Sequence, residues 1–299
     1  MPTEEFVPKE FNDRDTRVIA AAISIIDDYQ EQGYTLTLRQ LYYQFVARDW
    51  LANDQKEYKR LGRIVSQARL AGLIDWEAIE DRTRNLAATP HWEDPRDILK
   101  SAAHAFAIDK WEDQHNRIEV WIEKEALSGV IEGICQELDV AYFACRGYTS
   151  QSEQWRAGKR FASYSRSGQA VTVLHLGDHD PSGIDMTRDN QDRLDLFSRF
   201  GISVKRIALN RGQIEEYDPP PNPAKLTDSR AGGYVRRFGY ESWELDALEP
   251  GVIVELIRDE VEALRDDDLW QSKVEEEAEI TQLLEQTGER WSEIEEMLR

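Results

Sequence analysis

Apolar residues recur at helical spacing in the N-terminal part of the chain. Within residues 56–72, Leu61, Ile64, Val65 and Ala68 stand at i, i+3, i+4 and i+7, which is the spacing of one helix face. The same kind of pattern predicts three helices, over residues 14–32, 38–50 and 56–72. Three short helices joined by tight turns are typical of a helix-turn-helix or winged-helix module.

The pattern changes after residue 116, where short apolar runs alternate with helical segments. We expect strands over residues 117–124, 140–147, 170–178 and 204–210. We expect helices between them over residues 126–138, 152–166 and 182–200. This alternation predicts an α/β domain in which a parallel sheet is covered by helices on both faces. In such sheets, functional residues gather at the carboxyl ends of the strands.

The remaining segments suggest domain boundaries. Residues 85–116 contain Pro90 and Pro95 and a short helix around residues 98–111, and we interpret this stretch as a connection. Residues 211–250 look irregular, and the chain from residue 251 onward has a helical pattern. We therefore expect a helical domain, a linker, an α/β domain and an acidic helical tail, over residues 1–90, 91–116, 117–250 and 251–299.

Charge is distributed unevenly along the chain. The formal net charge is −21, which argues at first against a nucleic-acid binder, because binding DNA means neutralising phosphates with Lys and Arg. However, residues 241–299 hold 20 acids and 5 bases, whereas residues 36–71 hold seven bases and three acids. The acidity is therefore concentrated in the tail, and a segment near the N-terminus is locally basic.

Four of these bases share one face of the third predicted helix. They are Lys56, Lys59, Arg60 and Arg63. Such a face suits a helix that lies on DNA phosphates, and a plain solvated surface is the alternative. Arg146 follows a predicted strand and is a further candidate phosphate ligand, with a structural role as the alternative.

Several absences in the sequence favour a cytoplasmic protein. The N-terminal segment is polar and has no apolar core of a signal peptide, and no apolar run reaches the length of a membrane span. The two cysteines, Cys135 and Cys145, are too few for a disulfide framework and fit a reducing compartment. We expect no membrane partner.

Acidic residues end two of the predicted strands. Glu123 follows one strand, and Asp178 and Asp180 follow another, so the three carboxylates converge if the strands are neighbours. Converging carboxylates need a cation, and all-oxygen ligands suit Mg²⁺, the usual ion of phosphoryl transfer. The alternative is that these acids only cap the following helices. Glu244 and Asp246 could extend the metal site or equally cap a helix.

These motifs resemble a known domain. A strand, Glu-Lys and a helix, followed by a strand ending in Asp-x-Asp, is the signature of the Toprim domain of topoisomerases, primases and related nucleases. The spellings VWIEKEAL, CRGYTS and LGDHDPSGID resemble the version in the topoisomerase VI A subunit and the meiotic double-strand-break protein. The resemblance assigns metal binding to Glu123, Asp178 and Asp180.

The same family uses a tyrosine on a preceding winged-helix domain, and LRQLYY (residues 38–43) resembles its motif. On a helix, Tyr42 falls on the apolar face, while Tyr43 lies four residues after Arg39 on the other face. A nucleophile needs access to a phosphate that a nearby arginine can hold. We therefore expect Tyr43 to be the accessible nucleophile, Arg39 to bind the scissile phosphate and Tyr42 to be a core residue.

The resemblance covers roughly residues 35–85 and 115–250 and implies a compact, stand-alone version of the A subunit. It implies Mg²⁺-dependent cleavage of double-stranded DNA, a covalent 5′-phosphotyrosyl link to Tyr43, and a homodimer in which each site cuts one strand. Only about thirty residues precede the motif helix, which argues against an ATPase partner subunit.

Two other functions stay open. The first is a Toprim nuclease that hydrolyses DNA with water, in which Tyr43 only contacts DNA. The second is a DNA-binding protein without catalytic activity, in which the acids are vestigial. The sequence does not decide whether broken strands are resealed, or which DNA sequence is the target.

Overall fold

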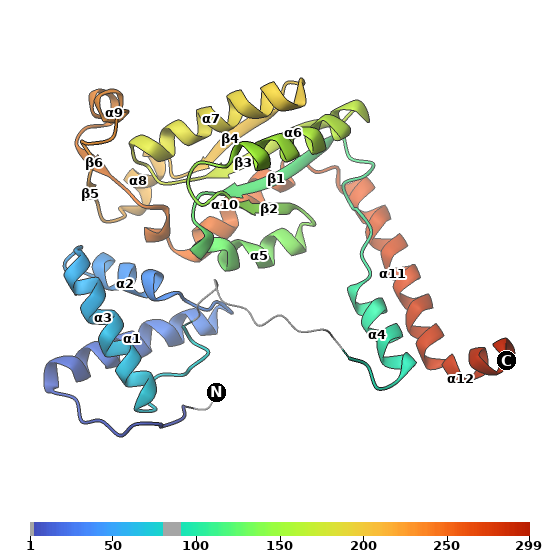
Figure 1. The fold of residues 1–299 in the computed structure, drawn as a ribbon, viewed down its shortest axis with the longest axis horizontal. Coiled ribbons are helices and arrows are strands. Elements are labelled where there is room, and N and C mark those ends of the chain that lie inside the picture. The colour runs from blue at the N-terminus through green and yellow to red at the C-terminus, as the bar shows by residue number, and fades with distance from the viewer. Residues whose placement is uncertain (1–2, 80–90) are drawn as a thin grey trace.

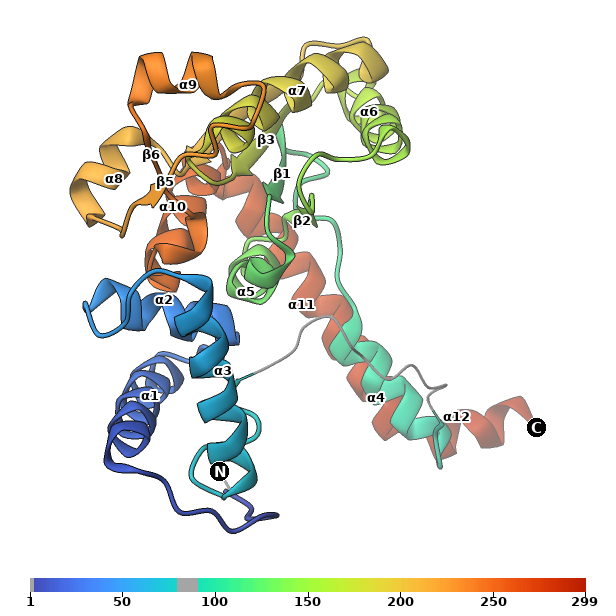
Figure 2. The same ribbon diagram turned by 60° about the vertical axis from the view of Figure 1, so that its left-hand side comes forward.

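The computed structural model describes residues 3–79 and 91–299, which form three parts (Figures 1 and 2). We call them the three-helix unit (residues 3–79), the α/β body (residues 116–262) and the arm, which consists of the helices over residues 95–105, 267–289 and 291–298. The three-helix unit lies beside the body, and its helix α2 (Leu38–Ala47) faces the body. The arm points away from both.

The three-helix unit contains the helices predicted from the N-terminal pattern: α1 (Asp13–Glu31), α2 (Leu38–Ala47) and α3 (Gln55–Leu70). Each helix starts at a polar cap, because the side chains of Asn12, Thr37 and Asp54 accept hydrogen bonds from backbone N–H groups of the first turn. The apolar faces meet in one core, which includes Ile25, Leu41, Phe45, Leu61 and Ile64. The prediction of three helices is confirmed.

Strands are nearly absent from the three-helix unit. Residues 3–79 contain only isolated bridges, one between Glu5 and Ala71 and one between Leu36 and Ile79. The unit is therefore a cluster of three helices, and the part of the chain that is described shows no β-hairpin wing of the kind that a winged-helix module carries.

The body is built on a four-stranded parallel sheet with the order β2-β1-β3-β4. Its strands are β1 (Asn116–Ile122), β2 (Ala141–Ala144), β3 (Ala170–Leu176) and β4 (Ser203–Ala208). All four coincide with predicted strands, and the expected α/β architecture is confirmed. However, β3 ends at Leu176, two residues earlier than expected, so Asp178 lies in the turn after the strand.

Helices cover both faces of the sheet (Figure 1). Helices α6 (Gln151–Arg166) and α7 (Pro181–Ser198) pack on one face. Helices α5 (Ser128–Glu137), which follows the short 3₁₀ helix η1 (Glu125–Leu127), and α10 (Pro250–Glu262) pack on the other. Side chains alternate accordingly, since Val120 belongs to the core under α5 and α10, whereas Trp121 belongs to the core under α6 and α7.

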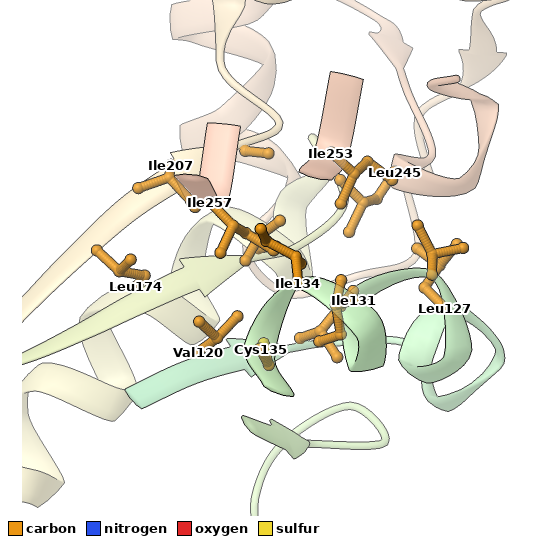
Figure 3. Close-up of a cluster of buried hydrophobic side chains, with 14 of the residues drawn as sticks. Val120, Leu127, Ile131, Ile134, Cys135, Leu174, Ile207, Leu245, Ile253 and Ile257 are labelled. Atoms are coloured by element: carbon orange, nitrogen blue, oxygen red, sulfur yellow. The ribbon is translucent and has the colours of Figure 1, made fainter. Parts of the chain in front are cut away.

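Helix α10 is an integral part of the body. Its Ile253 and Ile257 are fully buried against Leu174 of β3 and Ile134 of α5 in one cluster (Figure 3). The sequence predicts the helix itself but assigns residues from 251 onward to a tail. The structure places the first helix of that segment in the hydrophobic core, because its apolar stripe covers an otherwise exposed sheet face.

Residues 211–250 are more regular than expected. They form α8 (Arg211–Tyr217), β5 (Asn222–Pro223), α9 (Ala231–Phe238), β6 (Glu241–Ser242) and the 3₁₀ helix η2 (Leu245–Ala247). The expectation of an irregular segment is wrong for α8 and α9. The proline run and paired glycines hide these short helices in the sequence, and tertiary contacts stabilise α9, whose Tyr234 donates a hydrogen bond to the carbonyl of His179 (2.8 Å).

The arm consists of α4 (Pro95–Ala105) packed along α11 (Asp267–Glu289), and it ends in α12 (Trp291–Leu298). The helix predicted around residues 98–111 stops at Ala105, and Trp111 instead enters the core of the body, donating its Nε1–H to the Leu138 carbonyl (2.9 Å). Residues 80–90, the end of the proposed helical domain and the start of the connection, lie outside the described residues. In the described chain, no helix is long and apolar enough to cross a membrane.

Candidate functional site

Glu123 and Asp178 meet at the carboxyl edge of the sheet. Strands β1 and β3 are adjacent and parallel, and the backbone N–H of Glu123 donates to the Leu176 carbonyl (2.8 Å) just beyond the last ladder pair. The backbone N–H of Asp178 in turn donates to Oε2 of Glu123 (2.9 Å). The two strand ends are therefore neighbours, and the condition for the convergence of Glu123 and Asp178 is met.

Asp178 and Asp180 have different surroundings. Oδ1 of Asp178 accepts a hydrogen bond from the N–H of Leu245 (2.8 Å) and lies 3.1 Å from Nζ of Lys124. Asp180 is the N-cap of α7, where its Oδ1 accepts hydrogen bonds from the N–H of Gly183 (2.6 Å) and the hydroxyl of Ser182 (2.9 Å). Because β3 ends before both residues, strand alternation does not aim the two carboxylates at one point.

The pKa values of the buried acids are shifted upward. Burial, followed by the neighbouring charge of Asp178, raises the pKa of Glu123 to about 8. Burial also raises the pKa of Asp178 to about 6, although the Lys124 ammonium works in the opposite direction. Both shifts mean that burial and neighbouring charge disfavour the ionised forms of these two carboxyl groups.

The three carboxylates have the chemistry of a Mg²⁺ site, but their positions do not form one. Glu123, Asp178 and Asp180 offer hard carboxylate oxygens, and within residues 3–79 and 91–299 each has one oxygen without a hydrogen bond. That donor set fits Mg²⁺. In these side-chain positions, however, no group of three or more His, Cys, Asp or Glu among the described residues could hold an ion together.

Lys124 is the cation that the fold itself places among these acids. Its Nζ lies 2.7 Å from Glu244 and 2.7 Å from Asp246, in addition to its contact with Asp178. Burial acts to lower the pKa of Lys124, but Asp246, Asp178 and Glu244 outweigh it and hold that pKa above its ordinary value. Lys124 therefore pairs with three carboxylates of the body.

Arg39 connects the three-helix unit to the same acids. Its Nε donates to Oδ2 of Asp246 (2.9 Å), and its Nη2 pairs with Glu244. We call Arg39, Lys124, Asp178, Glu244 and Asp246 the ion-pair network. It joins α2 to η2 across more than 200 residues of sequence, and it gives Glu244 and Asp246 a structural role that the sequence left open.

Tyr43 is buried beneath this contact. Only 3% of the residue is exposed, and its hydroxyl lies 3.4 Å from Nη2 of Arg39. Burial, followed by the charges of Asp246 and Glu244, raises the pKa of Tyr43 well above its ordinary value. The expectation that Tyr43 is accessible, with Arg39 free for a phosphate, is therefore wrong for this arrangement, because η2 packs across the face of α2 that carries both residues.

Tyr42 is a core residue, as expected. Its hydroxyl accepts a hydrogen bond from the N–H of Asp54 (2.8 Å) and lies 2.9 Å from the Ala52 carbonyl, which fixes the turn between α2 and α3. His175 is completely buried in β3, with its Nδ1 2.8 Å from the Thr187 hydroxyl.

The candidate DNA-binding bases behave in two ways. Lys56, Lys59 and Arg63 are exposed on α3 and form no ion pair within the described chain. Arg60 instead pairs with Glu57 (3.0 Å) and Asp15 (3.4 Å) and is half-buried, so it stabilises the three-helix unit. Arg146 pairs with Glu125 of η1, although most of its side chain is exposed.

Sequence reasoning missed Arg206, which holds the turn that contains Asp178. Its Nη2 donates to the carbonyls of Gly177 (2.7 Å) and Asp178 (2.6 Å), and its Nη1 donates to the carbonyl of Gly183 (2.9 Å). The strand sequence VKRIA gives no sign of this role, because the apolar pattern predicts only that Arg206 lies in a strand.

Comparison with known proteins adds no family assignment. No protein-family model matches the chain, and no curated protein sequence shows significant similarity to it.

Proposed function

We propose that this protein cleaves DNA by the mechanism of the topoisomerase VI A subunit. The proposal is supported by one observation: the strand ends that bear the acids and the helix α2 meet at one edge of the sheet. Glu123 and Asp178 end adjacent parallel strands there, and the helix that carries Tyr43 docks on the same edge through Arg39 and Asp246. In the family that the motifs resemble, the tyrosine of the helix and the acids of the strand ends act in one reaction.

In the proposed reaction, the Tyr43 oxygen attacks a backbone phosphorus while the bond from phosphorus to the 3′ oxygen breaks. The products are a 5′-phosphotyrosyl link and a 3′-hydroxyl end, which takes up the proton that the tyrosine gives up. Glu123, Asp178 and Asp180 would hold Mg²⁺, which supplies charge stabilisation for the transferring phosphoryl group. Arg39 would bind the scissile phosphate.

The arrangement sets a condition on this reaction. Arg39 and Tyr43 must leave η2 before a phosphate can reach them, because Tyr43 is buried and the guanidinium of Arg39 is occupied by Asp246 and Glu244. A homodimer in which Tyr43 of one subunit meets the acids of the other would satisfy this condition. Exposed Lys56, Lys59 and Arg63 on α3 would then contact the double-stranded DNA backbone.

A second candidate is a Toprim-type nuclease in which water is the nucleophile. The burial of Tyr43 favours it, because water at Glu123 and Asp178 needs no movement of α2. In that case Tyr43 packs between the three-helix unit and the body, and DNA cleavage leaves no covalent adduct.

The test is to incubate the protein with supercoiled plasmid and Mg²⁺, denature it, and measure nicked or linear DNA and DNA bound covalently to protein. The variants are Tyr43→Phe, Asp178→Asn and, as a matched control, Tyr58→Phe, which removes a hydroxyl that makes no hydrogen bond in the described chain. We expect wild type and Tyr58→Phe to form the adduct, and the other two variants to lose it.

Cleavage that persists in Tyr43→Phe, with no adduct in any sample, would replace this proposal with the nuclease. DNA binding without cleavage in Mg²⁺ or Mn²⁺ would leave a DNA-binding protein without catalytic activity.

A further inference from the structure

A second feature lies on the other side of the turn that holds Asp178. A pocket of about 750 Å³ opens between α7, β4, α8 and α9. His179 lines it and directs its Nδ1 to the hydroxyl of Tyr234 in α9 (2.8 Å), whereas its neighbour Asp178 points to Leu245 and Lys124. The pocket is therefore distinct from the ion-pair network.

Charge in this pocket is opposite in sign to that of the chain. The charged side chains that line it, His179 aside, are Arg188, Arg206, Arg211, Arg230, Arg237 and Asp185. Five guanidinium groups thus line one pocket of a protein with a formal net charge of −21. Three of them pair with carboxylates: Arg188 with Asp185 and Asp192, Arg211 with Glu215, and Arg230 with Asp185 and Asp228. The five cations still outnumber these four carboxylates. Such local concentration of positive charge is typical of a site that binds an anion.

Two of these arginines have no carboxylate partner within the described chain. Arg206 is held by backbone carbonyls and the Thr187 hydroxyl, all neutral acceptors. Arg237, on the exposed side of α9, forms no hydrogen bond to a described residue. The carboxylates of Glu123, Asp178 and Asp180 lie near Arg206 and balance part of its charge. The charge of Arg237 has no carboxylate partner in the described chain, and an anionic ligand would compensate it.

Three guanidinium groups of the pocket lie over aromatic rings. Arg211 lies over the Trp243 ring (5.3 Å to the ring centroid), Arg230 over Tyr148 (4.8 Å) and Arg237 over Phe238 (4.9 Å). Arg211 also donates to Glu215, and Arg230 donates to Asp185 and Asp228. An arginine that an aromatic ring holds in this way loses less freedom on binding, and its planar fork matches the oxygens of a phosphate.

We propose that this pocket binds the phosphate groups of a nucleotide, either free or at the end of a DNA strand. The volume is in the range of small-molecule sites and far exceeds that of one phosphate. Ile184, Val204 and Phe238 add apolar lining beside the arginines, which suits the base or sugar of a nucleotide. This inference goes beyond the proposed cleavage, since it involves neither Tyr43 nor the acids.

The experiment measures binding in EDTA, so that neither DNA cleavage nor a metal contributes. Fluorescence anisotropy follows three probes: a fluorescent ATP analogue, a short single-stranded oligonucleotide with a 5′-phosphate, and the same oligonucleotide with a 5′-hydroxyl. The variants are Arg237→Ala and Arg211→Ala, with Arg236→Ala as the matched control. Arg236 is the preceding residue of the same helix, is exposed, and does not line the pocket.

We expect Arg237→Ala and Arg211→Ala to weaken binding about tenfold each, because each removes charge-assisted hydrogen bonds to phosphate. Arg236→Ala should change the affinity less than about twofold. Binding of the ATP analogue identifies a free nucleotide as the source of the phosphate, and preference for the 5′-phosphorylated strand identifies a strand end.

The proposal fails if no probe gives saturable binding, or if Arg236→Ala weakens binding as much as Arg237→Ala, which would indicate general attraction by surface charge. Loss of the covalent DNA adduct in the plasmid assay would not affect this result, because the two measurements use different residues and conditions.

Discussion

Nζ of Lys124 lies 2.7 Å from Oδ1 of Asp246, and Nε of Arg39 lies 2.9 Å from Oδ2 of the same carboxylate. The Asp246 side chain is only 1% exposed, so its charge is compensated by these cations and not by water. One buried aspartate thus joins a lysine that follows β1 to an arginine of α2.

Replacing Arg39 should loosen the attachment of the three-helix unit to the body. In Arg39→Ala, Asp246 and Glu244 keep only Lys124 as a cation. Because the arginine side chain is 44% exposed, we expect a modest loss of about 1 kcal/mol in the free energy of unfolding, with faster limited proteolysis. Arg63→Ala, which removes an exposed arginine without an ion pair in the described chain, should change neither measurement. Equal effects of the two variants would contradict the linking role of Arg39.

Replacing Lys124 should be far more damaging. Lys124→Met leaves Asp178 and Asp246 without their common cation, and removing one partner of a buried ion pair typically costs about 3–5 kcal/mol. If these acids accept Mg²⁺, added Mg²⁺ should raise the melting temperature of Lys124→Met more than that of wild type. Lys205→Met, which breaks the exposed pair with Glu260, should cost less than about 1 kcal/mol. A stable Lys124→Met variant would refute this account of the ion-pair network.

Helices α6 and α7 approach each other at Gly158. A Cβ atom at this residue would lie 2.5 Å from Cβ of Phe197 and 2.9 Å from its carbonyl carbon, which leaves no room for a methyl group. We expect Gly158→Ala to destabilise the protein by about 1–3 kcal/mol in urea unfolding. Gly133→Ala is the matched control, since a Cβ there meets no atom within 4 Å, and it should stabilise α5 by about 0.5–1 kcal/mol. The same sign for both variants would contradict the close packing at Gly158.

His175 should make the protein sensitive to acid. Burial, with the neighbouring charge of Arg206, lowers the pKa of His175 to about 3, whereas an unfolded histidine titrates near pH 6.5. Between these values the unfolded state binds more protons, so stability is present at pH 7 and is lost as the pH falls below about 6.5. Between pH 7 and pH 5 we expect wild type to lose about 1–2 kcal/mol more than His175→Gln.

Chemical unfolding at the two pH values measures this difference. His179, whose pKa is also lowered by burial, to about 4, contributes with the same sign but is present in both proteins and cancels in the comparison. Identical pH dependence of wild type and His175→Gln would show that His175 does not set the acid sensitivity.

The sequence predicted what depends on local pattern. The four strands and most helices followed from apolar spacing. The meeting of Glu123 with Asp178 was expected on the condition that their strands are neighbours, and strand order, which the local pattern does not give, decides that condition. Around α9, which has no side-chain cap and contains paired glycines, the pattern gave no signal.

The sequence could not predict contacts between distant segments. The burial of Tyr43 depends on residues about 200 positions away, and nothing near Tyr43 signals that η2 covers it. For the same reason Arg39 was expected at a phosphate and was found on Asp246. Tertiary structure decides which partner a charged side chain pairs with, and helical spacing in the sequence does not reveal that partner.

The position of α10 also has a consequence for synthesis on the ribosome. The three-helix unit is complete once Ile79 has been added and can acquire its core early, because domains fold as units from the N-terminal end. The sheet cannot, because Val120 and Leu174 lie on a face that α5 covers only in part until Ile253 and Ile257 have been translated. The nascent α/β body therefore carries an open apolar surface through most of its synthesis, and general chaperones would meet the protein at that face.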